Sequence, residues 1–188
     1  MNKYRVIAIC GESAAGKDTY LQEMLKVGYG EVHEIISCTT RPPRQNELDG
    51  RNYHFLTSKQ YADKIKRGEM LETSHFRDWF YGTSIDALQH NKINIGVFNP
   101  TGIRSLLKDP RVSVYVVRMI APAKMRLLRS LNREDNPDVD EIVRRYLADE
   151  EDFKDFFLEN ERIFNVGEEG MRDMAIATLA EARSFWAD

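Results

Sequence analysis

The stretch Gly11–Lys17, which reads GESAAGK, decides the fold of this chain of 188 residues. It follows the apolar run Tyr4–Cys10 and precedes a helical pattern near Tyr20, so the spacing G-x-x-x-x-G-K lies between a strand and a helix. In that position glycines let backbone N–H groups point at phosphate, and a lysine reaches the β and γ oxygens of a nucleoside triphosphate. The residues predicted to bind ATP are Gly11, Ser13, Ala14, Ala15, Gly16, Lys17, Asp18 and Thr19. We therefore expect a P-loop NTPase fold.

The residue after the lysine departs from the usual pattern, because Asp18 stands where a hydroxyl residue is commoner and Thr19 follows it. One interpretation is structural, since an aspartate in the first turn of a helix interacts favourably with the helix dipole. The other is chemical: a carboxylate this close to a polyphosphate is repelled unless a metal ion lies between them. The predicted cofactor is Mg²⁺, with Asp18 and Thr19 as its candidate ligands.

Strand and helix patterns alternate along the rest of the chain. Apolar runs occupy residues 33–38, 70–76, 93–98, 112–117 and 162–166, and helical patterns occupy 58–67, the segment after 101, 124–134, 140–157 and the C-terminal segment. Such alternation is typical of an α/β protein with a parallel sheet. Between residues 38 and 54 two prolines and an Asp-Gly pair predict an extended loop that bears arginines, and the segment up to Gly82 resembles a small inserted subdomain.

Composition excludes several kinds of protein. The formal net charge of −3 gives no basic field for nucleic acid, so nucleic acid is not an expected partner. No run approaches the roughly 18 apolar residues of a membrane span, so a membrane is not expected either. With two cysteines, Cys10 and Cys38, a disulfide framework is excluded and the cytoplasm is the expected location. The four histidines show no spacing suited to zinc.

Five arginines crowd the two helical patterns on either side of the polar segment 135–140, DNPDVD: Arg126, Arg129, Arg133, Arg144 and Arg145. Phosphoryl transfer needs cations around the migrating group and the exclusion of water, and a mobile segment that carries arginines supplies both. The alternative is a basic helix face exposed to solvent. In the presence of a phosphate-binding loop, the pattern favours an arginine lid.

Four motifs, in this order and at these separations, resemble the guanylate kinase family: GESAAGKDT (11–19), SCTTRPPRQNELDGRNYHF (37–55), MLET (70–73) and FYGTS (80–84). The resemblance runs from about Val6 to Tyr146. The segment with arginines and prolines is far more specific than the phosphate loop, which many unrelated families share. The resemblance implies an α/β P-loop NTPase three-layer fold with a parallel sheet, an acceptor-binding insertion and an arginine lid. We divide the expected single domain into a core (1–36, 92–125 and 146–188), the insertion (37–91) and the lid (126–145).

The same resemblance implies a reaction and roles for residues. ATP would phosphorylate GMP or dGMP, and these nucleotides are the expected partners; the oligomeric state stays open. Contacts to the acceptor phosphate are implied for Arg41, Arg44, Tyr53 and Tyr81, and contacts to guanine for Ser37, Glu72, Thr83 and Asn99. Planar arginine donors match phosphate, and one carboxylate can accept from both adjacent donors of guanine. Catalytic roles are implied for Lys17, Arg129, Arg133 and Arg145, and contact with the adenosine side of ATP for Asn165.

The chain also departs from the family pattern. The segment 96–102 reads GVFNPTG, so Val97 and Asn99 stand where guanylate kinases carry acidic residues, and the segment from Gly82 to Gly102 is shortened. Together with Asp18, Asn99 points to a relative, ribose 1,5-bisphosphate phosphokinase, in which Arg44, Tyr53 and Glu72 would have no base to serve. Two further hypotheses are a kinase for another base and a non-enzymatic interaction module, although such a module would be expected to lose Lys17.

Overall fold

A five-stranded parallel sheet forms the centre of the computed structural model, which describes residues 3–44, 46–76, 78–133, 135–158, 161–165 and 170–187. The strand order is β2-β7-β1-β8-β9, with every neighbouring pair parallel. The strands are β1 (Tyr4–Cys10), β2 (Val32–Glu34), β7 (Ile93–Val97), β8 (Val112–Ile120) and β9 (Glu161–Asn165). The carboxyl ends of parallel strands meet at one edge of a sheet, and the phosphate-binding loop begins where β1 ends.

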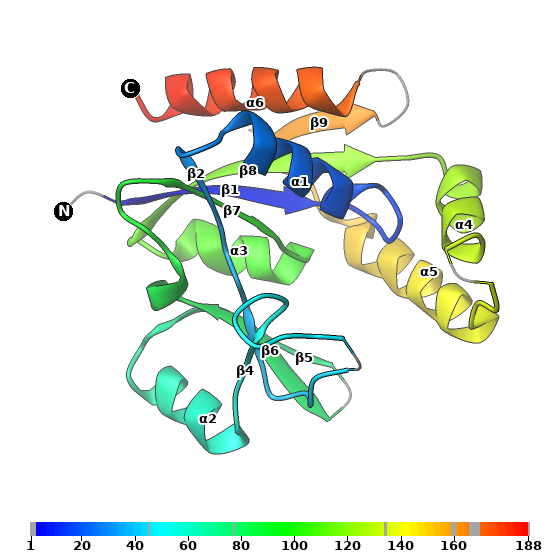
Figure 1. Ribbon diagram of the computed structural model, residues 1–188, viewed down its shortest axis with the longest axis horizontal. Helices are drawn as coiled ribbons and strands as arrows, with labels where there is room; N and C mark the ends of the chain where they lie inside the picture. The colour runs from blue at the N-terminus through cyan, green and yellow to red at the C-terminus, as the bar shows by residue number, and fades with distance from the viewer. Residues whose placement is uncertain are drawn as a thin grey trace.

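Helices cover both faces of this sheet, and they bury β1 on both sides. Ile7 and Ile9 face a core built with α1 (Lys17–Val27) and α6 (Met171–Phe185). Val6, Ala8 and Cys10 face a second core, to which α3 (Pro100–Lys108) contributes Ile103 and Leu106. Neighbouring residues of a strand point to opposite faces, so an unbroken apolar run is what a fully covered parallel strand requires. The α/β three-layer P-loop fold is confirmed (Figure 1).

A second, four-stranded sheet lies below the core in Figure 1, and its order is β4-β3-β6-β5. Its strands are β3 (Cys38–Thr39), β4 (His54–Phe55), β5 (Met70–Phe76) and β6 (Trp79–Ser84), and a short 3-10 helix follows at Ile85–Ala87. Between β4 and β5 lies α2 (Ser58–Lys66), which begins with a capping box formed by Thr57 and Gln60. The polar segment between β3 and β4 contains no helix or strand in its described part, as its prolines predict.

The apolar run at residues 33–38 is divided between the two sheets. Val32–Glu34 pairs with β7 in the core, whereas Cys38 and Thr39 pair with β4 and β6 in the second sheet. The run therefore carries the chain from one sheet to the other. Ser37, predicted to contact guanine, lies at this crossing, directly before β3.

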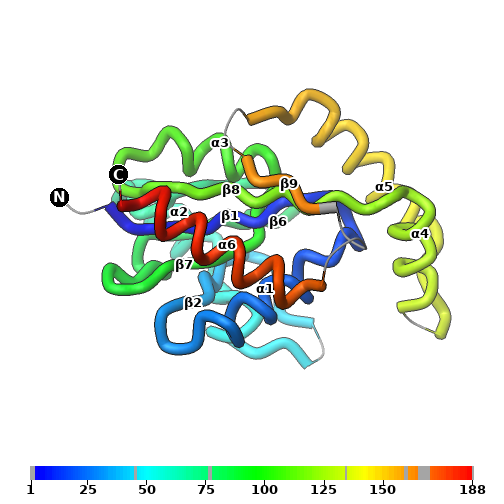
Figure 2. Tube along the Cα trace, turned by 90° about the horizontal axis from the view of Figure 1, so that it is seen from above, coloured from blue at the N-terminus to red at the C-terminus, as the bar shows by residue number. Residues whose placement is uncertain are grey.

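Two helices project beyond the edge of the core sheet where β1 and β8 end: α4 (Ala123–Leu131) and α5 (Val139–Lys154). They lie at one end of the molecule, whereas the beginning of β1 and the end of α6 lie at the other (Figure 2). Asp138 starts α5, since its side chain accepts from the backbone N–H of Glu141 at 3.0 Å. In the described part of the chain, no helix is both long and apolar enough to span a bilayer.

Gly11 is expected to tolerate no side chain. Its φ is +145°, and a Cβ there would lie 2.3 Å from the carbonyl oxygen of Met119. Gly30 also has positive φ, +78°, but a Cβ there would meet nothing within 4 Å. We predict that Gly11→Ala lowers the free energy of unfolding by about 3 kcal/mol, from backbone strain plus crowding. The matched variant Gly30→Ala should cost about 1 kcal/mol from strain alone. Urea unfolding of the two variants measures both losses. Equal losses would show that the backbone near Met119 shifts enough to remove the crowding at position 11.

Candidate active site

The loop after β1 has the backbone geometry that its glycines predict. Gly11 and Gly16 have positive φ, and Ala14 also adopts the left-handed region at +60°. Gly16 is the residue that precedes the first turn of α1. Ala15 is buried in the core beneath the loop, and Gly11 is buried against Met119. The loop therefore wraps around the N-terminal end of α1, where backbone N–H groups can bind an anion.

Lys17 begins α1 and folds over this loop. Its Nζ donates to the carbonyl oxygen of Glu12 at 2.9 Å. Burial lowers the pKa of Lys17, and the nearby carboxylates of Asp149 and Asp18 oppose that shift. A cation with little access to water interacts strongly with any anion that enters the loop.

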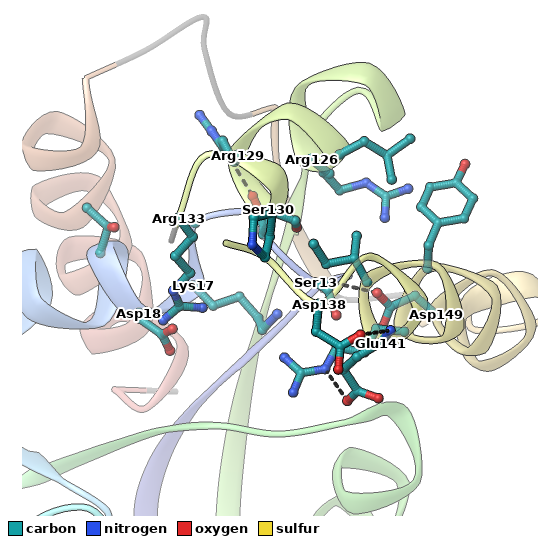
Figure 3. Close-up of a pocket in the computed structure, with 18 of the residues that line it drawn as sticks. Ser13, Lys17, Asp18, Arg126, Arg129, Ser130, Arg133, Asp138, Glu141 and Asp149 are labelled. Carbon is teal, nitrogen blue, oxygen red and sulfur yellow. Dashed lines mark hydrogen bonds and ion pairs between the residues drawn. The ribbon is translucent and has the colours of Figure 1, made fainter. Parts of the chain in front are cut away.

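A cavity of about 540 Å³ opens in front of the loop, between α1, α4 and α5 (Figure 3). Nine of the residues predicted to bind ATP or to catalyse transfer line it: Ser13, Ala14, Gly16, Lys17, Asp18, Thr19, Arg129, Arg133 and Arg145. Asp18 and Thr19 lie in the first turn of α1. Asn165 ends β9, but its side chain lies outside the described residues. The structure thus brings the loop and the lid arginines together around one space.

The three predicted lid arginines make different contacts. Arg129 donates from Nη1 to the carbonyl oxygen of Ala14 at 3.2 Å, so it already touches the loop. Arg145 donates from Nε to Glu141 on its own helix at 2.8 Å. Arg133 is exposed and lines the cavity beyond the end of α4. The predicted lid therefore reaches the loop through Arg129, while the other two arginines border the cavity.

Among the cavity residues outside the predicted set, Arg126 and Asp149 contact the phosphate-binding loop. Arg126 is buried, and its Nη2 lies 3.4 Å from Oε1 of Glu12 and 3.3 Å from Oε1 of Glu150. Asp149 accepts through Oδ2 from the backbone N–H of Ser13 at 2.7 Å. The sequence does carry a signal for Asp149, since it follows Arg145 by four residues and therefore shares its face of α5.

In the second sheet, three predicted guanine contacts form a chain of hydrogen bonds. The hydroxyl of Thr83 donates to Oε1 of Glu72 at 2.9 Å. Since a hydroxyl has one hydrogen, Ser37 is the donor in its 2.9 Å contact with Thr83. Glu72 and Thr83 lie on the paired strands β5 and β6, where they are direct cross-strand neighbours.

Glu72 is buried, with 9% of its surface exposed, although it is a carboxylate. Burial raises the pKa of Glu72 to about 7, and the hydrogen bond from Thr83 opposes part of that shift. A buried carboxylate is costly unless it is paired. Among the described residues, the hydroxyl of Thr83 is the hydrogen-bond partner of the Glu72 carboxylate. The carboxylate can therefore accept from two further donors of a ligand.

The residues predicted to hold the acceptor phosphate converge on Arg41, which is 6% exposed. Its guanidinium carbon lies 5.7 Å from the ring centre of Tyr53, and the rings of Tyr53 and Tyr81 are 6.0 Å apart. Glu47, which lies outside the predicted set, accepts from Nη2 of Arg41 at 2.9 Å and from the backbone N–H of Arg44 at 2.7 Å. The side chain of Arg44 is exposed beside this group. We call Arg41, Arg44, Tyr53 and Tyr81 the arginine–tyrosine clamp.

Asn99 has a structural role in addition to its predicted one. It precedes α3, and its Oδ1 accepts from the backbone N–H of Gly102 at 2.7 Å, which caps the helix. A methyl group at Gly102 would lie 3.2 Å from this oxygen and 3.5 Å from Oε2 of Glu72, so Asn99 and Glu72 are near the same point. A ligand would therefore meet an amide whose oxygen is already engaged and whose Nδ2 group is a donor.

Comparison with known proteins agrees with this geometry. The guanylate kinase family profile matches residues 3–165. The guanylate kinase of Thermotoga maritima is 33% identical over 149 residues, which cover 76% of this chain and 70% of that protein. The human guanylate kinase is 30% identical over 159 residues, covering 82% of this chain and 80% of that protein. The crystal structure of guanylate kinase from Anaplasma phagocytophilum superposes with a TM-score of 0.69 at 15% identity, covering 98% of this chain and 87% of that one, and so shares the fold. The chain therefore belongs to the guanylate kinase family of P-loop phosphotransferases.

Proposed function

We propose that the protein transfers the γ-phosphoryl group of ATP to GMP or dGMP, giving ADP and GDP or dGDP. The observation that carries the base assignment is the buried carboxylate of Glu72, which has a hydroxyl chain on one side and a capped helix on the other. Family membership supports the same reaction. The core is proposed to bind ATP, the segment 37–91 to bind the acceptor, and the segment 126–145 to act as the lid.

On the ATP side, the loop and Lys17 are proposed to hold the phosphates. The N–H groups of residues 11–19 supply donors, and the partly dehydrated ammonium of Lys17 supplies charge. Asn165 is proposed to contact the adenosine. Arg129, Arg133 and Arg145 are proposed to stabilise the charge on the migrating phosphoryl group, since they line the same cavity.

Mg²⁺ is the proposed cofactor, with Asp18 and Thr19 as its ligands. A carboxylate and a hydroxyl, both in the first turn of α1 and lining the cavity, are oxygen donors of the kind that Mg²⁺ prefers. When bound, the ion would neutralise charge on the β and γ phosphates. Asp18 also lies where an aspartate favours the helix dipole, and this contribution does not depend on the ion.

On the acceptor side, the arginine–tyrosine clamp is proposed to hold the nucleotide phosphate. Two planar guanidinium groups and two phenolic hydroxyls can fix a dianion in one orientation. Glu72 is proposed to accept from the ring N–H and the exocyclic amine of guanine, while Ser37 and Thr83 orient that carboxylate. Asn99 is proposed to donate from Nδ2 to the base.

Catalysis then rests on position and charge. Phosphoryl transfer asks little covalent chemistry of the protein, so the two sites act by aligning acceptor and donor oxygens while the lid excludes water. Among the described residues, Cys10 and Cys38 are free and buried, which fits the reducing cytoplasm that we propose as the location. Neither nucleic acid nor a membrane is a proposed partner.

Replacing the loop lysine should abolish transfer without unfolding the protein. Lys17→Met removes a cation that lines the cavity, and we predict a fall in kcat of about a hundredfold or more. Lys26→Met is the matched control, because Lys26 is exposed on the same helix and pairs with Glu23. Steady-state assays that follow ADP formation, with thermal unfolding of both variants, provide the measurement. Retention of more than about a tenth of kcat would contradict the role of Lys17.

A panel of acceptors tests the base. Wild type should prefer GMP and dGMP over AMP, CMP and UMP by at least about tenfold in kcat/KM, the range of one good hydrogen bond to a charged group. Glu72→Gln should reduce this preference, whereas Asn99→Asp, which keeps the helix cap, should preserve GMP activity or raise it. Indifference to the base would sink the guanine assignment. Faster phosphorylation of ribose 1,5-bisphosphate than of any nucleotide would favour the sugar phosphate kinase instead.

The burial of Glu72 should be visible in the pH dependence of stability. A carboxyl group whose pKa is about 7 in the folded state and lower in the unfolded state holds its proton more tightly when folded. Its stabilisation is therefore complete below about pH 4 and is lost as the pH rises through about 7. Between pH 5 and pH 8, wild type should lose up to about 3 kcal/mol more unfolding free energy than Glu72→Gln.

The control for this measurement is Glu69→Gln. Hydrogen bonds from Arg67 and Lys64 lower the pKa of Glu69, so it stays ionised across this range and its removal should leave the pH profile unchanged. Denaturant unfolding at several pH values supplies the data. Parallel profiles for wild type and Glu72→Gln would mean that Glu72 is not held in a dehydrated site.

A further inference from the structure

The phosphate-binding loop already holds an anion, because a carboxylate from α5, the helix whose first two turns belong to the proposed lid, is hydrogen-bonded to it. Oδ2 of Asp149 lies 2.7 Å from the backbone nitrogen of Ser13, whose N–H donates to it. The two residues are 136 positions apart in the chain. Figure 3 shows the carboxylate reaching the loop from α5, on the wall of the cavity that also contains Lys17.

The position of α5 holds this contact in place. Glu141, Arg145 and Asp149 follow one another at intervals of four residues, so they lie on the helix face that lines the cavity. On the same side, buried Arg126 reaches both Glu12 of the loop and Glu150 of α5, at 3.4 and 3.3 Å, and its guanidinium lies 5.1 Å from the ring centre of Tyr146. The carboxylate is thus delivered to Ser13 by a helix that is itself tied to the loop.

Asp149 accepts from Ser13 the kind of hydrogen bond that a bound phosphate would accept. A loop of this type binds phosphate through backbone N–H groups, and a carboxylate is an anion that accepts the same hydrogen. The N–H of Ser13 cannot donate to the Asp149 carboxylate and to a phosphate at the same time, because two anions that close together repel each other. We propose that Asp149 is an internal competitor for the phosphate-binding loop, which ATP must displace in order to bind. This inference depends on the proposed binding of ATP by the loop and does not depend on the identity of the acceptor.

Displacement of Asp149 by ATP makes the position of the lid depend on whether nucleotide is bound. Attraction between Asp149 and the loop holds α5 near α1; when phosphate occupies the loop, the same carboxylate is repelled and α5 must shift or turn. The apparent affinity for ATP is then reduced by the fraction of molecules in which Ser13 is engaged by the carboxylate. Asp149 is therefore a positioning residue that sets both the ATP affinity and the resting place of the lid.

Nucleotide binding by three variants tests the competition. Calorimetry measures the Kd of wild type, Asp149→Ala, Asp149→Asn and the control Glu151→Gln for pyrophosphate and for a non-hydrolysable ATP analogue. Glu151 is an exposed carboxylate two residues further along α5, so its variant makes the same change of net charge away from the loop. We expect Asp149→Ala to bind both probes about tenfold more tightly than wild type. Asp149→Asn, whose neutral oxygen can still accept from Ser13, should fall in between, and Glu151→Gln should match wild type.

The backbone amide of Ser13 provides a second readout, which can be measured in wild type as well as in the variant. In wild type its hydrogen exchange should be slow without nucleotide and should stay slow when the ATP analogue replaces the carboxylate. In Asp149→Ala it should be at least about tenfold faster without nucleotide and equal to wild type with it. Fast exchange in wild type without nucleotide would overturn the proposal even if a variant failed to fold.

Binding that is unchanged or weaker in Asp149→Ala would also overturn it, since weaker binding would make Asp149 a ligand for the nucleotide. The competition is separable from the proposed reaction. A protein that binds the ATP analogue as expected but does not phosphorylate GMP would refute the acceptor assignment and leave the role of Asp149 intact. A protein whose loop binds neither probe, with Ser13 protected by Asp149, would refute ATP binding together with the competition.

Discussion

The structure depends on a set of backbone N–H groups held at the end of β1. Left-handed residues at Ala14 and Gly16 turn these groups inward, and the close approach of Gly11 to the carbonyl of Met119 fixes the loop against the neighbouring strand. Such donors are costly when they have no partner and strongly favourable when an anion is present. The apolar, buried part of β1, residues 6–10, packs between helices on both faces and keeps this loop in one place. Both α4 and α5 contact this loop, through Arg129 and Asp149.

The requirement for an anion explains why carboxylates are found where phosphates are proposed to bind. Asp149 meets the N–H of Ser13, and Glu47 joins the guanidinium of Arg41 to the N–H of Arg44. Charged hydrogen bonds of this kind satisfy donors that would otherwise be left without partners in partly dehydrated surroundings. In each proposed phosphate site, a carboxylate of the chain itself therefore already accepts hydrogen bonds from some of the donors.

Local patterns predict the loop and most strands, whereas contacts between distant segments escape prediction. The glycine spacing predicts the loop, and β5 occupies the predicted residues, because both depend on neighbours in the sequence. The run 33–38 does not reveal its passage between two sheets, since an apolar run does not say which sheet its ends join. The spacing of Asp149 from Arg145 indicates a shared helix face, but it does not reveal the partner of Asp149, which is 136 residues away. The engagement of Asn99 as a helix cap depends on the start of α3, and helix ends are among the features least fixed by sequence.

The cap at Asn99 restricts which residues can stand at position 99, near the carboxylate of Glu72. Asn and Asp cap helices about equally well, whereas most other side chains would cost about 1 kcal/mol of helix stability. An exchange between these two residues at position 99 therefore leaves α3 intact while changing the charge and the donors offered next to Glu72. Asn99 is thus a position at which an amide can be exchanged for a carboxylate, and the proposed contact with the base altered, without a penalty in folding.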